Sequence, residues 1–262
     1  MNENLAYYPD IKIQVEQVGK RGGRRVGFLD ELRGTLIILV VLYHLCYDLV
    51  YIHGIQLEWF TGKWASAFQL CLSGMFIVAS GFSSNLSSRP YARALKVCAC
   101  AAVISAVTLL SFPSQGIKFG VLHFLGAAML LYAIFRDAIA YVRPSTGCAV
   151  SALLAVASWN IPNGYIGAGA LSFPLPEALY ELTWLFPLGV AGPDFYSADY
   201  FPLFPYIFVF LFGTFAFGLA GAFSERQSQG YMKPIAAAGR HSLLIYMLHQ
   251  PALMGALFLI MR

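Results

Sequence analysis

Long apolar runs alternate with short polar connections along the whole chain. There are seven such runs, at residues 34–52, 65–82, 94–112, 120–135, 147–159, 203–223 and 242–261. A helix needs about 20 apolar residues to cross the hydrocarbon core of a bilayer. The pattern therefore predicts an all-α, polytopic membrane bundle of about seven transmembrane helices. The run at 147–159 is short, and we expect that span to continue into residues 160–166.

Basic residues fall mainly on one side of these predicted spans. If the N-terminus is cytoplasmic, 14 of the 17 Lys and Arg residues lie on cytoplasmic segments, and only Lys63, Lys118 and Arg262 lie outside. Cytoplasmic loops carry such an excess of positive charge, so the distribution predicts an N-in, C-out topology. Residues 1–26 are polar and basic, lack the apolar core of a cleavable signal peptide, and are predicted to form a cytoplasmic tail ahead of a membrane domain at 27–262.

The segment at 162–202 does not read as an ordinary span. It is apolar but rich in proline, has no Lys or Arg, and carries Glu177, Glu181, Asp194 and Asp199. Proline at this density is incompatible with a regular helix. We expect an external lid or re-entrant segment with a short helix near residues 177–184. The alternative is an amphipathic spacer on the outer leaflet.

Composition narrows the class of protein further. Hydrophobic residues make up 58% of the chain, charged residues 11%, and the mean hydropathy is +0.65. Soluble domains carry roughly 25% charged residues, so a soluble enzyme, a disordered protein, a coiled coil and a nucleic-acid binder are excluded. The five cysteines lie in apolar runs without a CxxC motif, and we expect buried free thiols, with no metal and no prosthetic group.

Ionisable residues inside the predicted spans are the first candidates for function, because they are costly to place in a membrane. The first span contains Arg33 at its cytoplasmic edge, His44 eleven residues later and Asp48 one turn beyond. At about 100° per residue these groups lie near one helix face. We expect Asp48 to orient His44 and Asp30 to pair with Arg33. A polar cluster that only holds helices together is the alternative.

Three further spans contribute polar candidates. His123 lies at the outer start of the fourth span, where an interfacial or packing histidine is the alternative. His249 and Gln250 precede Pro251 in the last span, and a proline there frees a backbone carbonyl near a substrate cavity. Ser80 lies among small residues at the end of the second span, where close helix packing is the alternative.

Several membrane activities are excluded by missing residues. The last span has no lysine for a retinal Schiff base, no GxSG nucleophile motif occurs, and a nucleotide P-loop is absent. No cluster of His, Cys and Asp has the spacing of metal ligands. The polar stripe of the first span, which consists of Asp30, Arg33, His44 and Asp48, therefore remains the main candidate for a functional site.

The order of short motifs resembles that of the transmembrane acyltransferase superfamily. Its features here are the Arg33 and His44 pair, FIVASGF at 76–82 and SLLIYMLHQP at 242–251. Within that superfamily, the chain is most similar to small bacterial proteins with a heparan-α-glucosaminide N-acetyltransferase-like catalytic domain. The motifs that carry this resemblance are FLDELRG at 28–34, YHLCYD at 43–48, FGVLHFLG at 119–126 and DYFPLFP at 199–205.

The resemblance implies an acyl-CoA-dependent O- or N-acyltransferase of the bacterial plasma membrane. Acetyl-CoA on the cytosolic side is the expected co-substrate, and a glycan or other small extracytoplasmic molecule the expected acceptor. Arg33 would bind the donor, and His44 would act as base or acyl carrier with Asp48 orienting it. His249, His123 and Ser80 are the candidates for oxyanion stabilisation or acceptor binding. Ser80, His123, Asp199 and Gln250 would bind substrate. The bilayer is the expected partner, and a homodimer is left open.

Two other classes of function fit the same polar stripe. A small-molecule or proton-coupled transporter would use it as a pathway, although transporters usually show internal repeats and none is visible in this sequence. A non-catalytic scaffold would use it as a polar core. Binding of acetyl-CoA would separate the acyltransferase from both.

Overall fold

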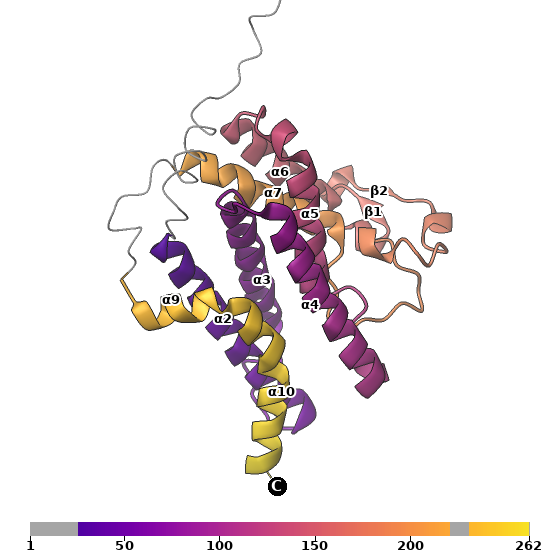
Figure 1. The fold of residues 1–262 in the computed structure, drawn as a ribbon. Coiled ribbons are helices and arrows are strands. Elements are labelled where there is room, and N and C mark those ends of the chain that lie inside the picture. Colours follow the sequence, from indigo (N-terminus) through magenta and orange to yellow (C-terminus); the bar gives the residue numbers. More distant parts are fainter. Residues whose placement is uncertain (1–25, 221–230, 262) are drawn as a thin grey trace, which may run out of the picture. The chain divides into compact units, whose positions relative to one another are not determined.

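The computed structural model describes residues 26–220 and 231–261, and these are predominantly helical (Figure 1). The basic stretch at 19–25 lies outside the described residues. Each of the seven predicted runs coincides with an α-helix, which confirms the all-α prediction. These helices are α2 (Gly27–Tyr47), α3 (Lys63–Ser84), α4 (Pro90–Ser111), α5 (Val121–Ile139), α6 (Pro144–Ser158), α7 (Leu203–Leu219) and α10 (Ser242–Ile260).

Five of these helices are long and apolar enough to cross a membrane. They are α2 together with the π-helical turn that follows it, α3, α4, α5 and α10. The other two are shorter, with 15 residues in α6 and 17 in α7. Large apolar side chains on the long helices are exposed, including Leu110 at 84% and Leu259 at 74%. Large exposed apolar side chains on helices of this length fit a lipid surrounding better than water.

The structure corrects two expectations about the segment after α6. The predicted extension of that span into residues 160–166 is wrong, because α6 ends at Ser158 and a 3-10 turn follows at Ile161–Asn163. Pro162 lacks the N–H that would continue the helix, and Gly164 turns the chain at φ +90°. The predicted helix near 177–184 is a single 3-10 turn, Glu177–Leu179. Short isolated helices are only marginally stable.

The rest of the 160–202 segment is held by short strands and tyrosine hydrogen bonds. Strands β1 (Tyr165–Ile166) and β2 (Phe173–Pro174) pair antiparallel. The Tyr180 hydroxyl donates to the Ile161 carbonyl, and the Tyr200 hydroxyl donates to the Phe186 carbonyl at 2.6 Å. Burial, with a smaller contribution from Tyr180, raises the pKa of Tyr200 to about 12. Both tyrosines therefore stabilise the segment as neutral donors.

The described chain divides into two compact units. The histidine unit, as we name it here, contains residues 26–79 and 231–261, and so α2, most of α3, α9 (Lys233–Arg240) and α10. The second unit contains residues 80–220, with the end of α3 and helices α4 to α7. The predicted site residues fall in both units.

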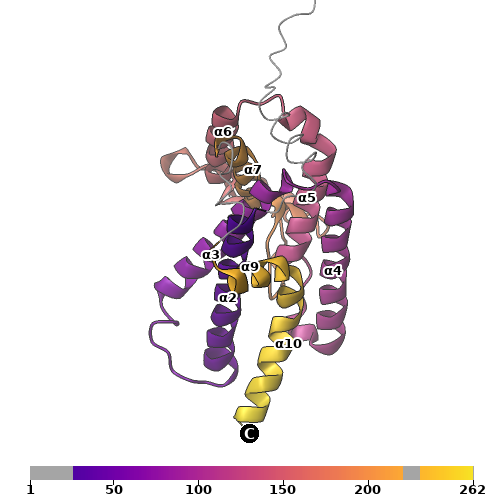
Figure 2. The same ribbon diagram turned by 60° about the vertical axis from the view of Figure 1, so that its left-hand side comes forward.

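Helix α9, which the sequence pattern did not predict, packs directly on α2. Figures 1 and 2 both show it lying across α2, with α10 continuing from it. Two glycines allow this contact, because a Cβ atom on Gly34 would overlap the Ile235 carbonyl and one on Gly239 would overlap the Asp30 carbonyl. A separate apolar core of Leu36, Leu72 and Ala79 joins α2 to α3.

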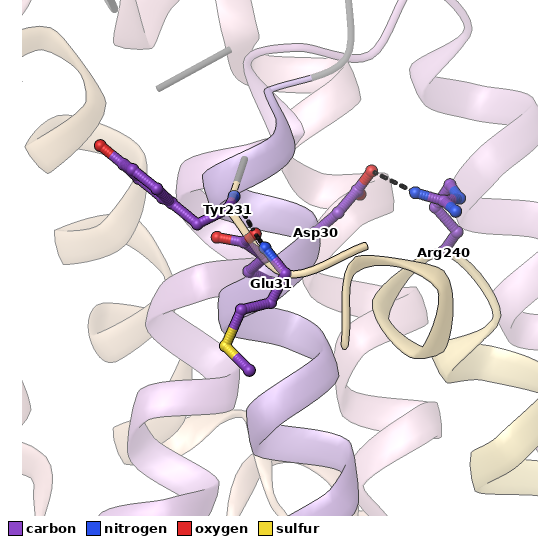
Figure 3. A network of polar contacts seen from close by, with 5 residues as sticks. Asp30, Glu31, Tyr231 and Arg240 are labelled. Carbon is purple, nitrogen blue, oxygen red and sulfur yellow. Dashed lines mark hydrogen bonds and ion pairs between the residues drawn. The ribbon is translucent and has the colours of Figure 1, made fainter. Parts of the chain in front are cut away.

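Acidic side chains at the start of α2 fasten α9 in place (Figure 3). The Glu31 carboxylate accepts hydrogen bonds from the backbone N–H groups of Tyr231 and Met232, which precede α9. Asp30 forms an ion pair of 4.0 Å with Arg240 at the other end of α9. Asp30 was expected to pair with Arg33, and it also interacts electrostatically with that residue.

Small residues allow similarly close contacts in the second unit. A Cβ atom on Gly81 would overlap the Phe210 carbonyl, so the end of α3 lies against α7. Gly126 of α5 lies against Cys98 of α4, where an added Cβ would be 2.5 Å from the sulfur. All five cysteines are free, but the expectation of buried thiols is met only by Cys148, because Cys71 is exposed and the other three are partly buried. Close backbone contacts between helices therefore add to the packing of large buried side chains such as Phe124 and Phe210 in this unit.

Candidate active site

The end of α2 changes its helical geometry at the first candidate residue. From Asp48 to Ile52 the chain forms a π-helical turn, and Asp48 is completely buried. Such turns insert one extra residue into a helix and occur frequently at functional sites. The sequence placed Asp48 one turn beyond His44 to orient its ring. In the structure the carboxylate instead has its partner on another helix.

That partner is Gln250 of α10. Its amide nitrogen Nε2 lies 2.8 Å from Oδ1 and 3.0 Å from Oδ2 of Asp48. An ionised carboxylate only accepts hydrogen bonds, so the amide NH₂ faces Asp48 and Oε1 faces away from it. Within residues 26–220 and 231–261, Asp48 makes no hydrogen bond to His44, and the expected orienting contact is not formed.

His249 lies next to Gln250 and is nine-tenths buried. Its Nδ1 atom is 2.6 Å from the backbone carbonyl of Tyr246. A carbonyl only accepts, so Nδ1 carries the proton and Nε2 holds a lone pair. Nε2 of His249 and Oε1 of Gln250 are both buried and have no hydrogen-bond partner among the described residues. A buried lone pair on an imidazole is the chemical requirement for a general base.

A second imidazole lies beside the first. The ring of His44, on α2, is centred 4.8 Å from the ring of His249, with an angle of 62° between the planes. His44 comes from the middle of a span and His249 from the last span, 205 residues later in the chain. The structure thus brings together four of the predicted residues, His44, Asp48, His249 and Gln250, in the histidine unit.

Arg33 lies at the opposite end of α2 from this group. Eleven residues separate it from His44, or about 16 Å along a helix. It is partly buried at the start of α2, close to Asp30 and to the crossing with α9. Lys233 and Arg240 of α9 add two exposed basic side chains to the same end of the histidine unit. The basic end of the histidine unit and the ring of His44 therefore lie at different heights along α2.

His123 and Asp199 lie together in the second unit, at the start of α5. His123 Nδ1 accepts from the backbone N–H of Gly120 at 3.2 Å, and its Nε2 lies 3.0 Å from the Ser105 hydroxyl. Asp199 Oδ2 accepts from the backbone N–H of Val121 at 2.9 Å. These contacts satisfy N–H groups that a helix start leaves unpaired. They give both side chains a structural task, and their roles in substrate binding stay predictions.

Ser80 is buried in the second unit, where its carbonyl accepts from the hydroxyls of Ser83 and Ser84 at 3.3 and 2.8 Å. It adjoins Gly81, at the close contact with α7. This setting agrees with the packing interpretation of the small residues in this motif. A binding role for Ser80 stays a prediction. No group of three His, Cys, Asp or Glu side chains is placed to hold a metal ion in the described part of the chain.

Comparison with known families gives this arrangement a context. Residues 25–251 match the family model for heparan-alpha-glucosaminide N-acetyltransferase, catalytic. The chain belongs to this family. The resemblance inferred from the short motifs is confirmed, and the chain is a multi-pass member of a membrane acetyltransferase family. No curated protein and no solved structure matches the chain significantly.

The family match runs from residue 25 to residue 251 and so includes His44, Asp48, His249 and Gln250. The sequence predicted that His44, Asp48, His249 and Gln250 are site residues, but it did not predict which of them contact each other. The adjacency of His249 and Gln250 was visible as a signal, because two polar residues before a proline interrupt an otherwise apolar span. That Gln250 would hold Asp48 was not visible, because 202 residues separate them.

Proposed function

We propose that the protein transfers an acetyl group from cytosolic acetyl-CoA to a hydroxyl or amine of an extracytoplasmic acceptor, in the first place a sugar. The observation that carries this proposal is the buried, unpartnered Nε2 atom of His249 beside the ring of His44. Membership of the acetyltransferase family supplies the reaction class. A transfer reaction of this kind needs a base that is sheltered from bulk water, and this imidazole has that environment.

In the proposed step, His249 Nε2 accepts the proton of the acceptor O–H or N–H group. The acceptor oxygen or nitrogen forms a bond to the carbonyl carbon of the thioester, and the C–S bond breaks. The leaving thiolate then takes the proton from the imidazolium, so that the products are acetylated acceptor and free CoA thiol. The Tyr246 carbonyl stabilises the imidazolium by accepting from Nδ1, as a triad carboxylate does in serine hydrolases.

The basic end of the histidine unit suits the donor. Acetyl-CoA carries several phosphate charges, and Arg33, Lys233 and Arg240 gather where α2 begins and α9 crosses it. Lys233 and Arg240 are seven residues apart and so lie on one side of α9, about 10 Å from each other along its axis. With the N-terminus in the cytoplasm, as the charge distribution predicts, this end faces the compartment that contains acetyl-CoA.

His44 has a distinct part in this proposal. Its ring adjoins His249, so it can share the proton of the imidazolium or take the acetyl group itself before the acceptor attacks. In the second route a ring nitrogen of His44 bonds to the thioester carbonyl carbon, the C–S bond breaks, and the thiolate takes the imidazole proton to give the CoA thiol. The acceptor then bonds to the acetyl carbon, the C–N bond to His44 breaks, and the acceptor proton passes through His249 Nε2 to the released imidazole. Both routes use His44 and His249. Only the second route leaves labelled acetyl on the protein when no acetyl acceptor is present.

The experiment uses the purified full chain in nanodiscs with radiolabelled acetyl-CoA, with D-glucosamine and hydroxylamine as acceptors. We expect acetylated product from the wild type and a loss of at least roughly a hundredfold in His249→Ala and His44→Ala. His241→Ala is the matched control, because His241 is exposed at the start of α10. No transfer and no binding of acetyl-CoA by the wild type would refute the proposal, and normal transfer by His249→Ala would refute its base.

A further inference from the structure

The Asp48 and Gln250 pair gives the site a second feature that the base alone does not supply. Both oxygens of the buried carboxylate accept from the same amide nitrogen, at 2.8 and 3.0 Å. This contact fixes the side-chain amide in one of its two orientations. The oxygen Oε1 is left buried without a partner among the described residues, and the adjacent residue on α10 carries the unpartnered His249 Nε2.

Two unpartnered acceptors on consecutive residues call for a ligand, because most buried polar atoms in proteins are hydrogen-bonded and leaving one unpaired is costly. A group that could satisfy them must donate hydrogen bonds. A thioester carbonyl, or the oxyanion that develops from it, only accepts and would be repelled by both atoms. The unpartnered pair is therefore complementary to an O–H or N–H group and opposed to an oxyanion.

We propose that Gln250 Oε1 binds an O–H or N–H donor of the acceptor molecule, and that Asp48 is the positioning residue that aims it. This inference rests on the proposed acetyl transfer and specifies part of its acceptor site. It also changes the role of Asp48, from orienting His44 to orienting Gln250. The acceptor belongs to the class of molecules that present a donor group in addition to the hydrogen removed by His249, as amines and polyhydroxyl compounds do.

The test is a double-mutant cycle on the full chain in nanodiscs, with hydroxylamine as the acceptor and acetyl-CoA at saturation. CoA release is followed by liquid chromatography, because the five cysteines react with thiol reagents, and the uncatalysed reaction is subtracted. In Asp48→Asn the Gln250 amide faces another amide instead of a carboxylate. The Gln250 amide can then rotate by 180° and exchange the positions of its oxygen and nitrogen. We expect it to raise the KM for hydroxylamine about tenfold and to change kcat less than about threefold. Gln250→Met keeps the side-chain volume but removes the hydrogen-bond-accepting oxygen Oε1, and it should raise the KM for hydroxylamine to a similar extent.

The double variant Asp48→Asn, Gln250→Glu supplies the decisive measurement. The amide introduced at position 48 would donate to one oxygen of the carboxylate introduced at position 250 and leave the other oxygen facing the acceptor. With Gln250→Glu measured as the second single variant of the cycle, we expect the KM of the double variant to return to within about threefold of wild type. Summed losses of Asp48→Asn and Gln250→Glu in the double variant would overturn the proposal. An unchanged KM in Gln250→Met would also overturn it, and this variant carries the test if Asp48→Asn does not fold.

Other outcomes identify which part has failed. Asp48→Asn could instead lower kcat and shift the pH profile while the KM for hydroxylamine stays unchanged. That result would mean that Asp48 orients a histidine, and it would overturn the proposed role of Gln250. Wild-type protein that binds acetyl-CoA but acetylates neither hydroxylamine nor D-glucosamine would overturn the proposed function and this inference with it. Wild-type transfer with unaffected variants would overturn only this inference.

Discussion

The crossing of α2 and α9 offers the sharpest test of the fold around the site. The perturbation is a single methyl group, introduced by Gly239→Ala. On this helix the new Cβ would fall within 3.0 Å of the Asp30 carbonyl oxygen, the Asp30 carbonyl carbon and the Gly34 nitrogen, whereas ordinary contact needs 3.4–4 Å. All three atoms belong to the backbone of α2. They cannot rotate away, so α9 itself must move outward.

The expected cost follows from two opposing terms. Forcing one extra methyl group into a tight contact costs about 1–3 kcal/mol, and the upper end applies because the obstacle is backbone. Replacing glycine by alanine within a helix returns about 0.8–1 kcal/mol. The net loss is about 2 kcal/mol, which corresponds to a fall in Tm of about 4–8 °C for a chain of this size.

The assay is thermal unfolding of the purified protein in one detergent, followed by intrinsic fluorescence. Gly255→Ala is the matched control, because Gly255 lies on α10 with no atom within 4 Å of an added Cβ. That variant should be unchanged or slightly more stable. A Tm for Gly239→Ala equal to or above that of Gly255→Ala would refute the close crossing, and with it the placement of α9 on α2.

Further predictions concern the donor end and the second unit. Lys233→Gln should raise the KM for acetyl-CoA several-fold. It should leave the KM for S-acetyl-N-acetylcysteamine, a donor without phosphates, unchanged. Lys63→Gln is the control, and equal effects of Lys233→Gln on both donors would contradict a phosphate contact. His123→Ala should lower stability by about 1 kcal/mol, in line with the loss of a helix cap, and a rise in the KM for the acetyl acceptor would separately support its predicted binding role. Gly81→Ala should lower Tm by several degrees, because the added Cβ overlaps the Phe210 carbonyl, and a normal melting curve would contradict the contact of α3 with α7.

The spans were predictable because their signal is local. Each apolar run is long enough to form a helix by itself in a membrane, and the helix bounds follow those runs closely except at α2, which begins seven residues early at Gly27. Helix α9 was missed for the opposite reason. It has eight residues, begins with Lys233 and Pro234, and owes its stability to Glu31 and the two glycines rather than to its own sequence.

The candidate site was predictable in membership but not in geometry. A lone charge or imidazole in an apolar run is conspicuous, which is why His44, Asp48 and His249 stood out. Which of them meet depends on how two distant helices cross, as the contacts of Asp48 with Gln250 and of His44 with His249 show. Helical periodicity relates Asp48 only to residues of its own helix, such as His44, and carries no information about a partner on α10.

The distance in sequence between the two histidines has a consequence for biosynthesis. Helix α2 leaves the ribosome early, whereas α10 follows about 200 residues later, and the imidazole pair exists only once α10 has packed against α2. Until then His44 lacks its neighbour, so under the proposed mechanism an incomplete chain has no sheltered base. The same separation makes the protein suitable for assembly from two fragments, with α10 supplied as part of a separate polypeptide.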